Sequence, residues 1–156
     1  MKILIPLDGS KVGEAALPYV KELLSTLSPR VKLELILLRV VSLQSHYVHV
    51  GDAMAPVAYT TEEIKQIRKR SLSYLSRVGK DLKAKGVVVG NKVEVGNAAE
   101  EIIRVADEMK VDLITMSTHG RSGISRWAFG SVTDRVLRGG HKPVLVVRAP
   151  KEATQT

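Results

Sequence analysis

Five short stretches rich in apolar residues are spread along the chain, and between them apolar residues recur at helical spacing. Continuous apolar runs are typical of parallel strands that are buried on both faces. Strands and helices therefore alternate, which predicts an α/β domain with an open, doubly wound parallel sheet and helices on both faces. We expect strands at Lys2–Leu7, Leu33–Val41, Val87–Val95, Asp112–Met116 and Pro143–Val147, the third with an irregularity at Gly90-Asn91.

Helical patterns fill most of the stretches between these strands. They cover Val12–Leu27, Thr60–Lys85, the residues after Asn97, and Val132–Arg138. Pro18 should bend the first helix, since proline cannot donate the backbone hydrogen bond that a helix interior needs. Thr60-x-x-Glu63 and Asn97-x-x-Glu100 have the spacing of helix-capping residues, and Gly139-Gly140 should end the last helix.

The stretch from Ser42 to Tyr59 has no clear helical or strand period. A loop of this length inside a small domain is usually functional, so we expect either a lid over a bound ligand or a contact surface for a partner. His46 and His49 are spaced as metal ligands can be, but the neighbouring sequence offers no third ligand. We therefore predict no metal site here.

Length and composition narrow the class of protein. A chain of 156 residues suits one domain, which we place at residues 1–149, followed by a disordered tail at 150–156. No apolar run approaches the ~20 residues of a membrane span, and the N-terminus leads directly into a strand, so we expect a cytoplasmic protein. The lack of cysteine excludes disulfides and thiolate metal sites.

The net charge of +8 suits an anionic partner. One Phe, one Trp and four Tyr leave little aromatic surface on which bases could stack, so we do not expect nucleic acid. Arg68, Lys69 and Arg70 follow one another on a predicted helix, and we interpret them as a solvated face. Positive charge is concentrated instead between Ser117 and Arg148, where six Lys or Arg accompany one acid.

The same segment joins a strand, a glycine-rich loop and the start of a helix. Gly120, Gly123 and Gly130 would let backbone N–H groups approach a ligand closely, and Ser131 stands where the helix begins. Free N–H groups and the positive end of the helix dipole make such a site suitable for phosphate. Neither a Gly-x4-Gly-Lys-Ser/Thr loop nor a Gly-x-Gly-x-x-Gly motif after a strand is present, which disfavours P-loop NTPases and standard NAD-binding domains.

Ser117-Thr118-His119-Gly120, followed after nine residues by Gly130-Ser131, resembles the nucleotide-binding signature Gly-x2-Gly-x9-Gly-Ser/Thr of the universal stress protein family. The likeness extends from Ile3–Ser10 to Lys142–Val147. It implies the UspA-like, ATP-binding subgroup and an adenine nucleotide alpha hydrolase-like fold with strand order 3-2-1-4-5. ATP, with Mg²⁺, is the implied ligand. The resemblance also implies a homodimer formed through the fifth strand, at Val144, Leu145, Val146 and Val147.

On this resemblance, nucleotide contacts would come from the first two strands and from the signature loop with its flanks. Main-chain N–H groups at Ser131 and Val132 would bind phosphate, and His119 and Arg121 could contact phosphate or Mg²⁺-bound water. The nucleotide-binding residues expected are Pro6, Leu7, Asp8, Val40, Met116, Ser117, His119, Gly120, Arg121, Gly130, Ser131 and Val132.

Several of these residues also have simpler structural roles. Asp8 could cap a turn, Val40 could be a core residue of its strand, and His119 could hydrogen-bond only to backbone. Ser117 replaces the first glycine of the signature. A positive φ there would strain serine by about 1 kcal/mol or more, whereas at an ordinary φ the hydroxyl could bond a ribose or phosphate oxygen. We favour the second case.

Three functions remain open, and we favour an ATP-binding regulatory protein of the stress response. The second is an enzyme that slowly hydrolyses ATP or transfers its phosphate. The sequence shows neither a positioned base with an orienting partner nor a clear carboxylate pair for Mg²⁺, so we assign no catalytic residue. The third is a binding or chaperone-like module without nucleotide, an alternative that Ser117 keeps open.

Overall fold

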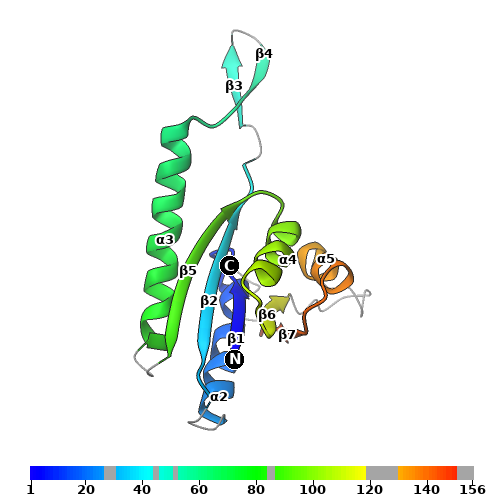
Figure 1. Cartoon of the computed structure of the whole chain (residues 1–156). Coiled ribbons are helices and arrows are strands. Elements are labelled where there is room, and N and C mark those ends of the chain that lie inside the picture. The colour runs from blue at the N-terminus through cyan, green and yellow to red at the C-terminus, as the bar shows by residue number, and fades with distance from the viewer. Residues whose placement is uncertain (27–30, 44–45, 51–52, 84–86, 119–129, 151–156) are drawn as a thin grey trace.

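Helices cover both faces of one parallel sheet (Figure 1). The computed structural model describes residues 1–26, 31–43, 46–50, 53–83, 87–118 and 130–150. The sheet consists of β1 (Lys2–Pro6), β2 (Glu34–Val41), β5 (Val88–Val95), β6 (Leu113–Thr118) and β7 (Val144–Arg148). Its order, β5-β2-β1-β6-β7, is the predicted 3-2-1-4-5, and every neighbouring pair is parallel. The predicted fold class is therefore confirmed.

Each face of the sheet has its own core. The helices are α1 (Lys11–Glu14), α2 (Ala16–Thr26), α3 (Thr61–Lys83), α4 (Ala98–Glu108) and α5 (Ser131–Gly139). Ile3 and Ile5 of β1 belong to the core beneath α2 and α3, while Leu4 belongs to the core beneath α4 and α5. Because alternate side chains of a strand point to opposite faces, a central strand covered on both sides must be apolar throughout.

The predicted helix over Val12–Leu27 is two helices that separate at Ala15. Pro18 lies in the first turn of α2 and has no N–H to donate to the carbonyl of Glu14, so the α-helical ladder cannot continue from α1. Ala15 instead donates its N–H to the carbonyl of Val12 at 3.1 Å, which closes α1 as a short turn. Pro18 therefore breaks the predicted helix and does not merely bend it.

Two strands differ from their predicted form. β6 continues past Met116, and Ser117 and Thr118 pair with residues of β7 instead of beginning the loop. The irregularity expected at Gly90-Asn91 is absent, because β5 pairs with β2 residue by residue from Val88 to Val95. Asn91 fits within the strand because its side-chain amide donates to the Ser76 hydroxyl of α3 at 2.9 Å.

The region predicted as an irregular loop contains a hairpin, so that prediction is wrong. Strands β3 (His46–Val50) and β4 (Ala53–Val57) are antiparallel, and together they project from the body beside the N-terminal end of α3 (Figure 1). Tyr47 pairs with Pro56, and proline is acceptable in a two-stranded sheet because each strand has a free edge. Proline and short strand length hid the hairpin from the sequence pattern.

The predicted capping residues begin their helices. Thr60 donates its N–H to the Glu63 carboxylate at 2.7 Å, and Glu63 returns its N–H to the Thr60 hydroxyl at 3.2 Å. The Asn97 side-chain oxygen accepts from the N–H groups of Ala99 and Glu100 at 3.1 and 3.4 Å. Both helices thus start where the sequence indicates.

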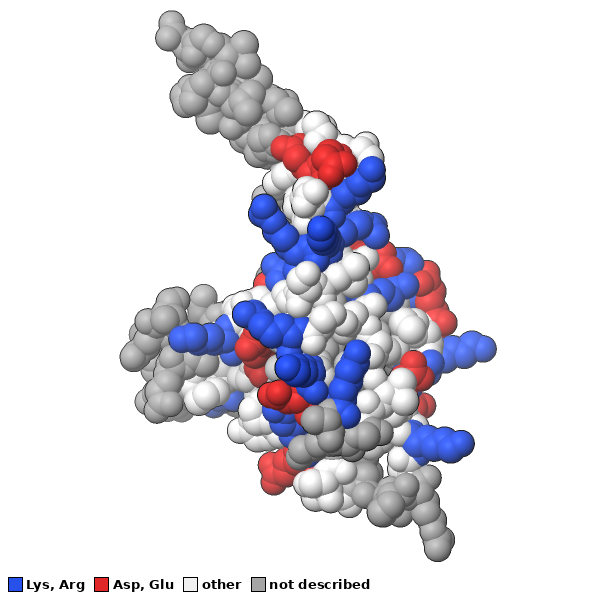
Figure 2. All heavy atoms as spheres, turned by 90° about the vertical axis from the view of Figure 1, so that its left-hand side faces the viewer, with Lys and Arg blue, Asp and Glu red and all other residues white. Residues whose placement is uncertain are grey.

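The outer face of α3 is basic, and Figure 2 views the molecule from that side. All of its Lys and Arg residues are exposed, which agrees with the predicted solvated face at Arg68, Lys69 and Arg70. They are Lys65, Arg68, Lys69, Arg70, Arg77, Lys80 and Lys83. Among the described residues, no helix combines the length and apolar character needed to cross a membrane. Of the predicted tail, 151–156 lies outside the described residues.

Candidate functional site

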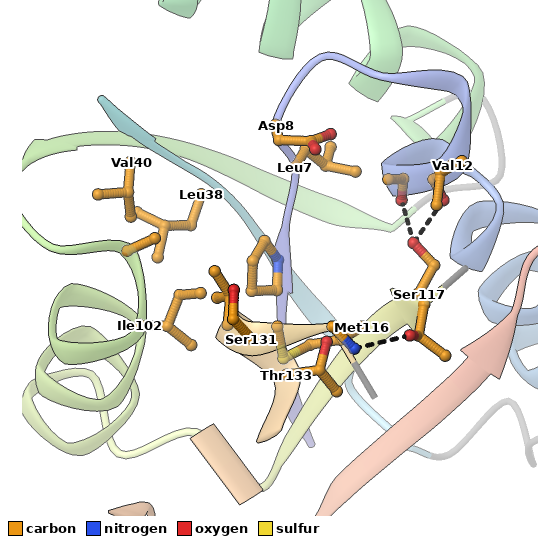
Figure 3. A pocket seen from close by; sticks show the side chains of 16 residues that line it. Leu7, Asp8, Val12, Leu38, Val40, Ile102, Met116, Ser117, Ser131 and Thr133 are labelled. Carbon is orange, nitrogen blue, oxygen red and sulfur yellow. Dashed lines mark hydrogen bonds between the residues drawn. The ribbon is translucent and has the colours of Figure 1, made fainter. Parts of the chain in front are cut away.

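A pocket of about 260 Å³ opens at the carboxyl ends of β1, β2 and β6 (Figure 3). β1 lies between β2 and β6, so the chain crosses over in opposite directions on either side of it, and open α/β sheets bind ligands at such a point. The pocket is lined by Pro6, Leu7, Asp8, Val12, Gly13, Leu38, Val40, Ala98, Ile102, Met116, Ser117, Thr118, Gly130, Ser131, Val132 and Thr133.

One side of the pocket is apolar. Leu38 and Val40 of β2 lie there beside Ile102 of α4, as Figure 3 shows, and Ala98 begins the same helix. Leu38 and Val40 share a face of β2 because they are two residues apart, and Ala98 and Ile102 share a face of α4 because they are four apart. Such a wall suits a flat, largely apolar ring system.

The pocket also offers backbone donors at the start of α5. Among the described residues, no side chain caps this helix, which begins after Gly130. Within the described part of the chain, no acceptor receives the N–H groups of Ser131, Val132 or Thr133. A Cβ added to Gly130 would meet no described atom within 4 Å, so the described residues leave space beside these donors. Unpaired N–H groups at the positive end of a nine-residue helix can bind an anion.

Asp8 lies at the end of β1 and shapes the turn into α1. Its Oδ1 atom accepts from the N–H and the hydroxyl of Ser10 at 2.9 and 2.7 Å. The Ser10 hydroxyl in turn accepts from the N–H of Gly13 at 2.9 Å, so Ser10 caps α1. A Cβ on Gly13 would lie 2.3 Å from Asp8 Oδ1, which means that the carboxylate has room only because residue 13 is glycine. Asp8 therefore has the turn-forming role as well as a place in the pocket.

The backbone at Ser117 decides between the strained and the ordinary conformation that the sequence leaves open. Its φ is negative, since Lys110 is the only non-glycine residue with a positive φ in the described ranges, so serine is not strained there. Its hydroxyl lies 2.5 Å from the carbonyl oxygen of Val12 and 3.0 Å from that of Gly13, to which it donates (Figure 3). The hydroxyl thus joins β6 to α1 instead of facing the hollow of the pocket.

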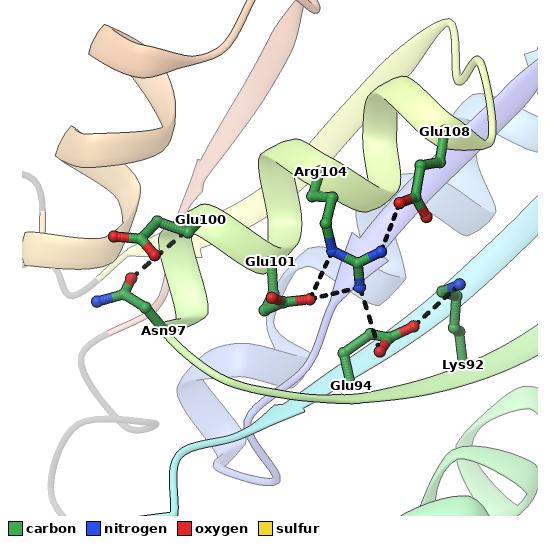
Figure 4. Close-up of polar contacts among 7 residues, drawn as sticks. All are labelled: Lys92, Glu94, Asn97, Glu100, Glu101, Arg104 and Glu108. Carbon is green, nitrogen blue, oxygen red and sulfur yellow. Dashed lines mark hydrogen bonds and ion pairs between the residues drawn. The ribbon is translucent and has the colours of Figure 1, made fainter.

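A charged network fixes α4, and with it the apolar wall (Figure 4). The Arg104 guanidinium contacts the carboxylates of Glu101, Glu108 and Glu94 at 2.5, 2.5 and 3.2 Å, and Lys92 contacts Glu94 at 2.9 Å. Burial acts to raise the pKa of Glu94, but the hydrogen bond from Lys92 and the charges of Lys92 and Arg104 prevail and lower it. Since Glu94 belongs to β5, the network ties α4 to the sheet.

Nine of the twelve predicted site residues line this pocket, namely Pro6, Leu7, Asp8, Val40, Met116, Ser117, Gly130, Ser131 and Val132. His119, Gly120 and Arg121 lie outside the described residues. Sequence reasoning missed Val12, Gly13, Leu38, Ala98, Ile102, Thr118 and Thr133. Leu38 could have been found from its two-residue spacing to Val40, and Gly13 from its place one turn after Ser10. In the described ranges, no three His, Asp or Glu side chains converge as metal ligands.

The sequence profile of the Universal stress protein family matches residues 1–148. The chain belongs to the universal stress protein family. Two curated relatives from Methanocaldococcus jannaschii, the universal stress proteins MJ0577 and MJ0531, are 32% and 34% identical to it. Their alignments cover 94% and 97% of this chain and 94% and 84% of the relatives.

Solved structures show the same fold. The structure of MJ0577 aligns with this universal stress protein at a TM-score of 0.70, with 29% identity and 96% of each chain covered. The Arabidopsis thaliana family protein At3g01520, solved with AMP bound, aligns at 0.67 with 14% identity, covering 100% of this chain and 96% of its own. A universal stress protein in complex with cAMP aligns at 0.61 with 20% identity, covering 95% and 96%. At these last two identities, the likeness shows the fold alone.

Proposed function

We propose that this universal stress protein binds an adenine nucleotide, ATP in particular, and acts as a nucleotide-dependent regulatory protein of the stress response. The observation that carries the proposal is that the N–H groups of Ser131, Val132 and Thr133 donate to no described residue and share a pocket with an apolar wall. Phosphate suits the first feature and adenine suits the second. Family members solved with AMP and with cAMP support this class of ligand.

The pocket residues then divide by chemistry. Leu38, Val40 and Ile102 would hold the adenine ring, with Met116 beneath it, and the start of α5 would receive the phosphates. Asp8 uses Oδ1 for Ser10, and its Oδ2 atom accepts no hydrogen bond from any residue that the structure describes. That oxygen can accept from the hydroxyls of a ribose. His119, Gly120 and Arg121 are proposed to complete the phosphate end, together with Mg²⁺.

Calorimetric titration of the wild-type protein with ATP, ADP, AMP and adenosine tests the proposal. Gly130→Asp is the informative variant, because its side chain enters open space and places a carboxylate beside the phosphate donors. We expect ATP affinity to fall more than about tenfold through charge repulsion, with adenosine affinity nearly unchanged. Gly130→Ala, the control for added bulk, should weaken ATP binding less than Gly130→Asp does.

Two outcomes would contradict nucleotide binding at this site. One is the absence of heat with every nucleotide at millimolar concentration, and the other is wild-type ATP affinity in Gly130→Asp. Incubation with ATP and Mg²⁺ separates a regulatory binder from an enzyme. We expect no more ADP or AMP from the wild-type protein than from Gly130→Asp.

We also propose that two copies form a homodimer through β7. This strand pairs only with β6, so its other edge is open within the described sheet. The strand is nevertheless apolar, and Leu145 is 39% exposed. An open apolar edge is prone to pair with another strand, and pairing with a second copy would satisfy it. The proposed contact comprises Val144, Leu145, Val146 and Val147.

A further inference from the structure

Three elements meet behind the pocket at Tyr74 of α3. The Tyr74 hydroxyl donates to a carboxylate oxygen of Glu14 in α1 at 2.9 Å. The guanidinium carbon of Arg39 in β2 lies 5.1 Å from the centroid of the Tyr74 ring, and that of Arg77 lies 5.7 Å from it. Burial raises the pKa of Tyr74, and the hydrogen bond to Glu14 raises it further, so the hydroxyl stays protonated and keeps donating.

Arg39 reaches from this cluster to the turn that carries Asp8. Leu38 and Val40 face the pocket, so Arg39 between them points to the opposite face of the sheet. Its Nη1 atom lies 2.6 Å from the place that a Cβ on Gly9 would occupy. Gly9 has a φ of 87°, which serine or alanine would rarely adopt. The guanidinium therefore rests directly on the backbone of the turn.

Packing, and not hydrogen bonding to described residues, fixes the Arg39 guanidinium beside the turn. Arg39 is half-buried as a residue, and its guanidinium makes no hydrogen bond or ion pair with any described residue. Its position therefore comes from packing between the Tyr74 ring on one side and Gly9 on the other. A planar guanidinium fits this space, because it can stack on an aromatic ring as an ammonium group cannot.

We propose that Arg39 is a positioning residue for nucleotide binding, holding the Asp8–Gly9 turn from behind in the shape that accepts the ligand. Through Tyr74 it also links that turn to α3 on the far face of the sheet. This inference rests on the proposed function. It adds a chain of contacts through which nucleotide binding can change the surroundings of α3, the helix that follows the β3–β4 hairpin. Arg39 itself does not line the pocket.

Arg77 provides a matched control, because it also contacts the Tyr74 ring, whereas the side chain that lies against Gly9 is that of Arg39. Both Arg39→Gln and Arg77→Gln remove one positive charge and one guanidinium from the ring. We expect Arg39→Gln to weaken binding of ATP and of uncharged adenosine about tenfold, while Arg77→Gln stays within about twofold of wild type. Arg39→Lys restores the charge without the planar group and should bind as weakly as Arg39→Gln.

Amide resonances measured by NMR supply a second readout. ATP saturation should shift the N–H signals of Tyr74 and Arg77 in the wild-type protein, and Arg39→Gln should reduce these shifts. Affinities are compared well below the melting temperature of each variant. If Arg39→Gln does not fold, Tyr74→Leu, which removes the ring that supports the arginine, should show the same loss, with Tyr74→Phe as its control.

The outcomes separate the inference from the function on which it rests. A wild-type protein that binds none of the ligands contradicts the proposed function and the inference with it. Wild-type binding with equal affinities for Arg39→Gln and Arg77→Gln overturns the inference alone. So does full recovery in Arg39→Lys, or a loss confined to ATP, because either would show that Arg39 acts only by long-range attraction of phosphate.

Discussion

Ser117 stands where the family signature has glycine, and its side chain has a structural partner of its own. The hydroxyl donates to carbonyl oxygens of Val12 and Gly13, so it crosses from β6 to α1 along the edge of the pocket. Gly13 in turn leaves the room that Asp8 occupies. Serine in place of glycine at residue 117 therefore adds a contact between β6 and α1. It leaves the backbone donors at the start of α5 unchanged.

Ser117→Ala should lower the free energy of unfolding by about 1–2 kcal/mol, because two half-buried carbonyls lose a donor. Urea denaturation measures the change. Ser73→Ala, at an exposed position of α3, serves as the control and should leave the free energy of unfolding nearly unchanged. ATP affinity of Ser117→Ala should match wild type. A large loss of affinity with unchanged stability would mean that the hydroxyl bonds the ligand after all.

Gly13→Ala should weaken nucleotide binding by moving Asp8. Gly13 lies in α1, where alanine suits the backbone, so the substitution acts mainly through the contact of 2.3 Å between the new Cβ and Asp8 Oδ1. We expect a loss of about tenfold in calorimetric affinity for adenosine as well as for ATP. In Gly90→Ala the new Cβ meets only the Leu35 carbonyl at 3.9 Å, so binding should not change. Equal affinities for the two variants would remove Asp8 from the site.

Helix α4 shows how one element can serve the pocket through contacts on its far side. Asn97 fixes where the helix begins, and the ion pairs of Arg104 with Glu94 fix how it lies on β5. Ala98 and Ile102 line the pocket on the side of the helix that these contacts leave free. The ion pairs are partly solvent-exposed, so each contributes modestly, and their shared function is to define one position for the helix.

Glu94 should make the stability of the protein depend on pH. Its pKa is lower in the folded than in the unfolded protein, so its contribution is complete above the unfolded pKa and is lost as pH falls through the folded one. The free energy of unfolding should therefore decrease below about pH 5, and less steeply in Glu94→Gln. Urea titrations at several pH values measure the slope. Ser73→Ala, which changes no charge at an exposed position of α3, should keep the wild-type slope. Equal slopes for wild type and Glu94→Gln would refute the assignment.

At the scale of the whole molecule, the fold could be predicted because strands buried on both faces of the sheet are recognisable in the sequence as apolar stretches. The centres of β1 and β2 are short apolar runs, and the glycine-rich segment before α5 has a recognisable spacing. The strand order came from resemblance to a family. Pro18 indicated an irregularity in the first helix, but the pattern predicted a bend where the structure has two separate helices.

The remaining parts depend on contacts between residues that are far apart in sequence. Nothing in the residue types of Leu38 or Ile102 distinguishes a pocket wall from an ordinary core, because both roles need the same apolar side chains. The partner of the Ser117 hydroxyl lies in another element, and so does the ring beneath Arg39. Such pairings follow from how the elements pack, which a single sequence does not contain.

The two edge strands of the sheet allow a controlled test of the proposed dimer. Leu145 on β7 and Val88 on β5 are both exposed apolar residues, at 39% and 66%, on opposite edges of one sheet. Leu145→Asp places an unpaired carboxylate where two β7 strands would meet. The free energy needed to bury this charge should outweigh much of the free energy of dimerisation. We expect its dissociation constant in sedimentation equilibrium to rise more than about tenfold, whereas Val88→Asp dimerises as wild type does. A monomeric wild-type protein would refute the dimer, and dissociation caused only by Val88→Asp would place the interface on β5.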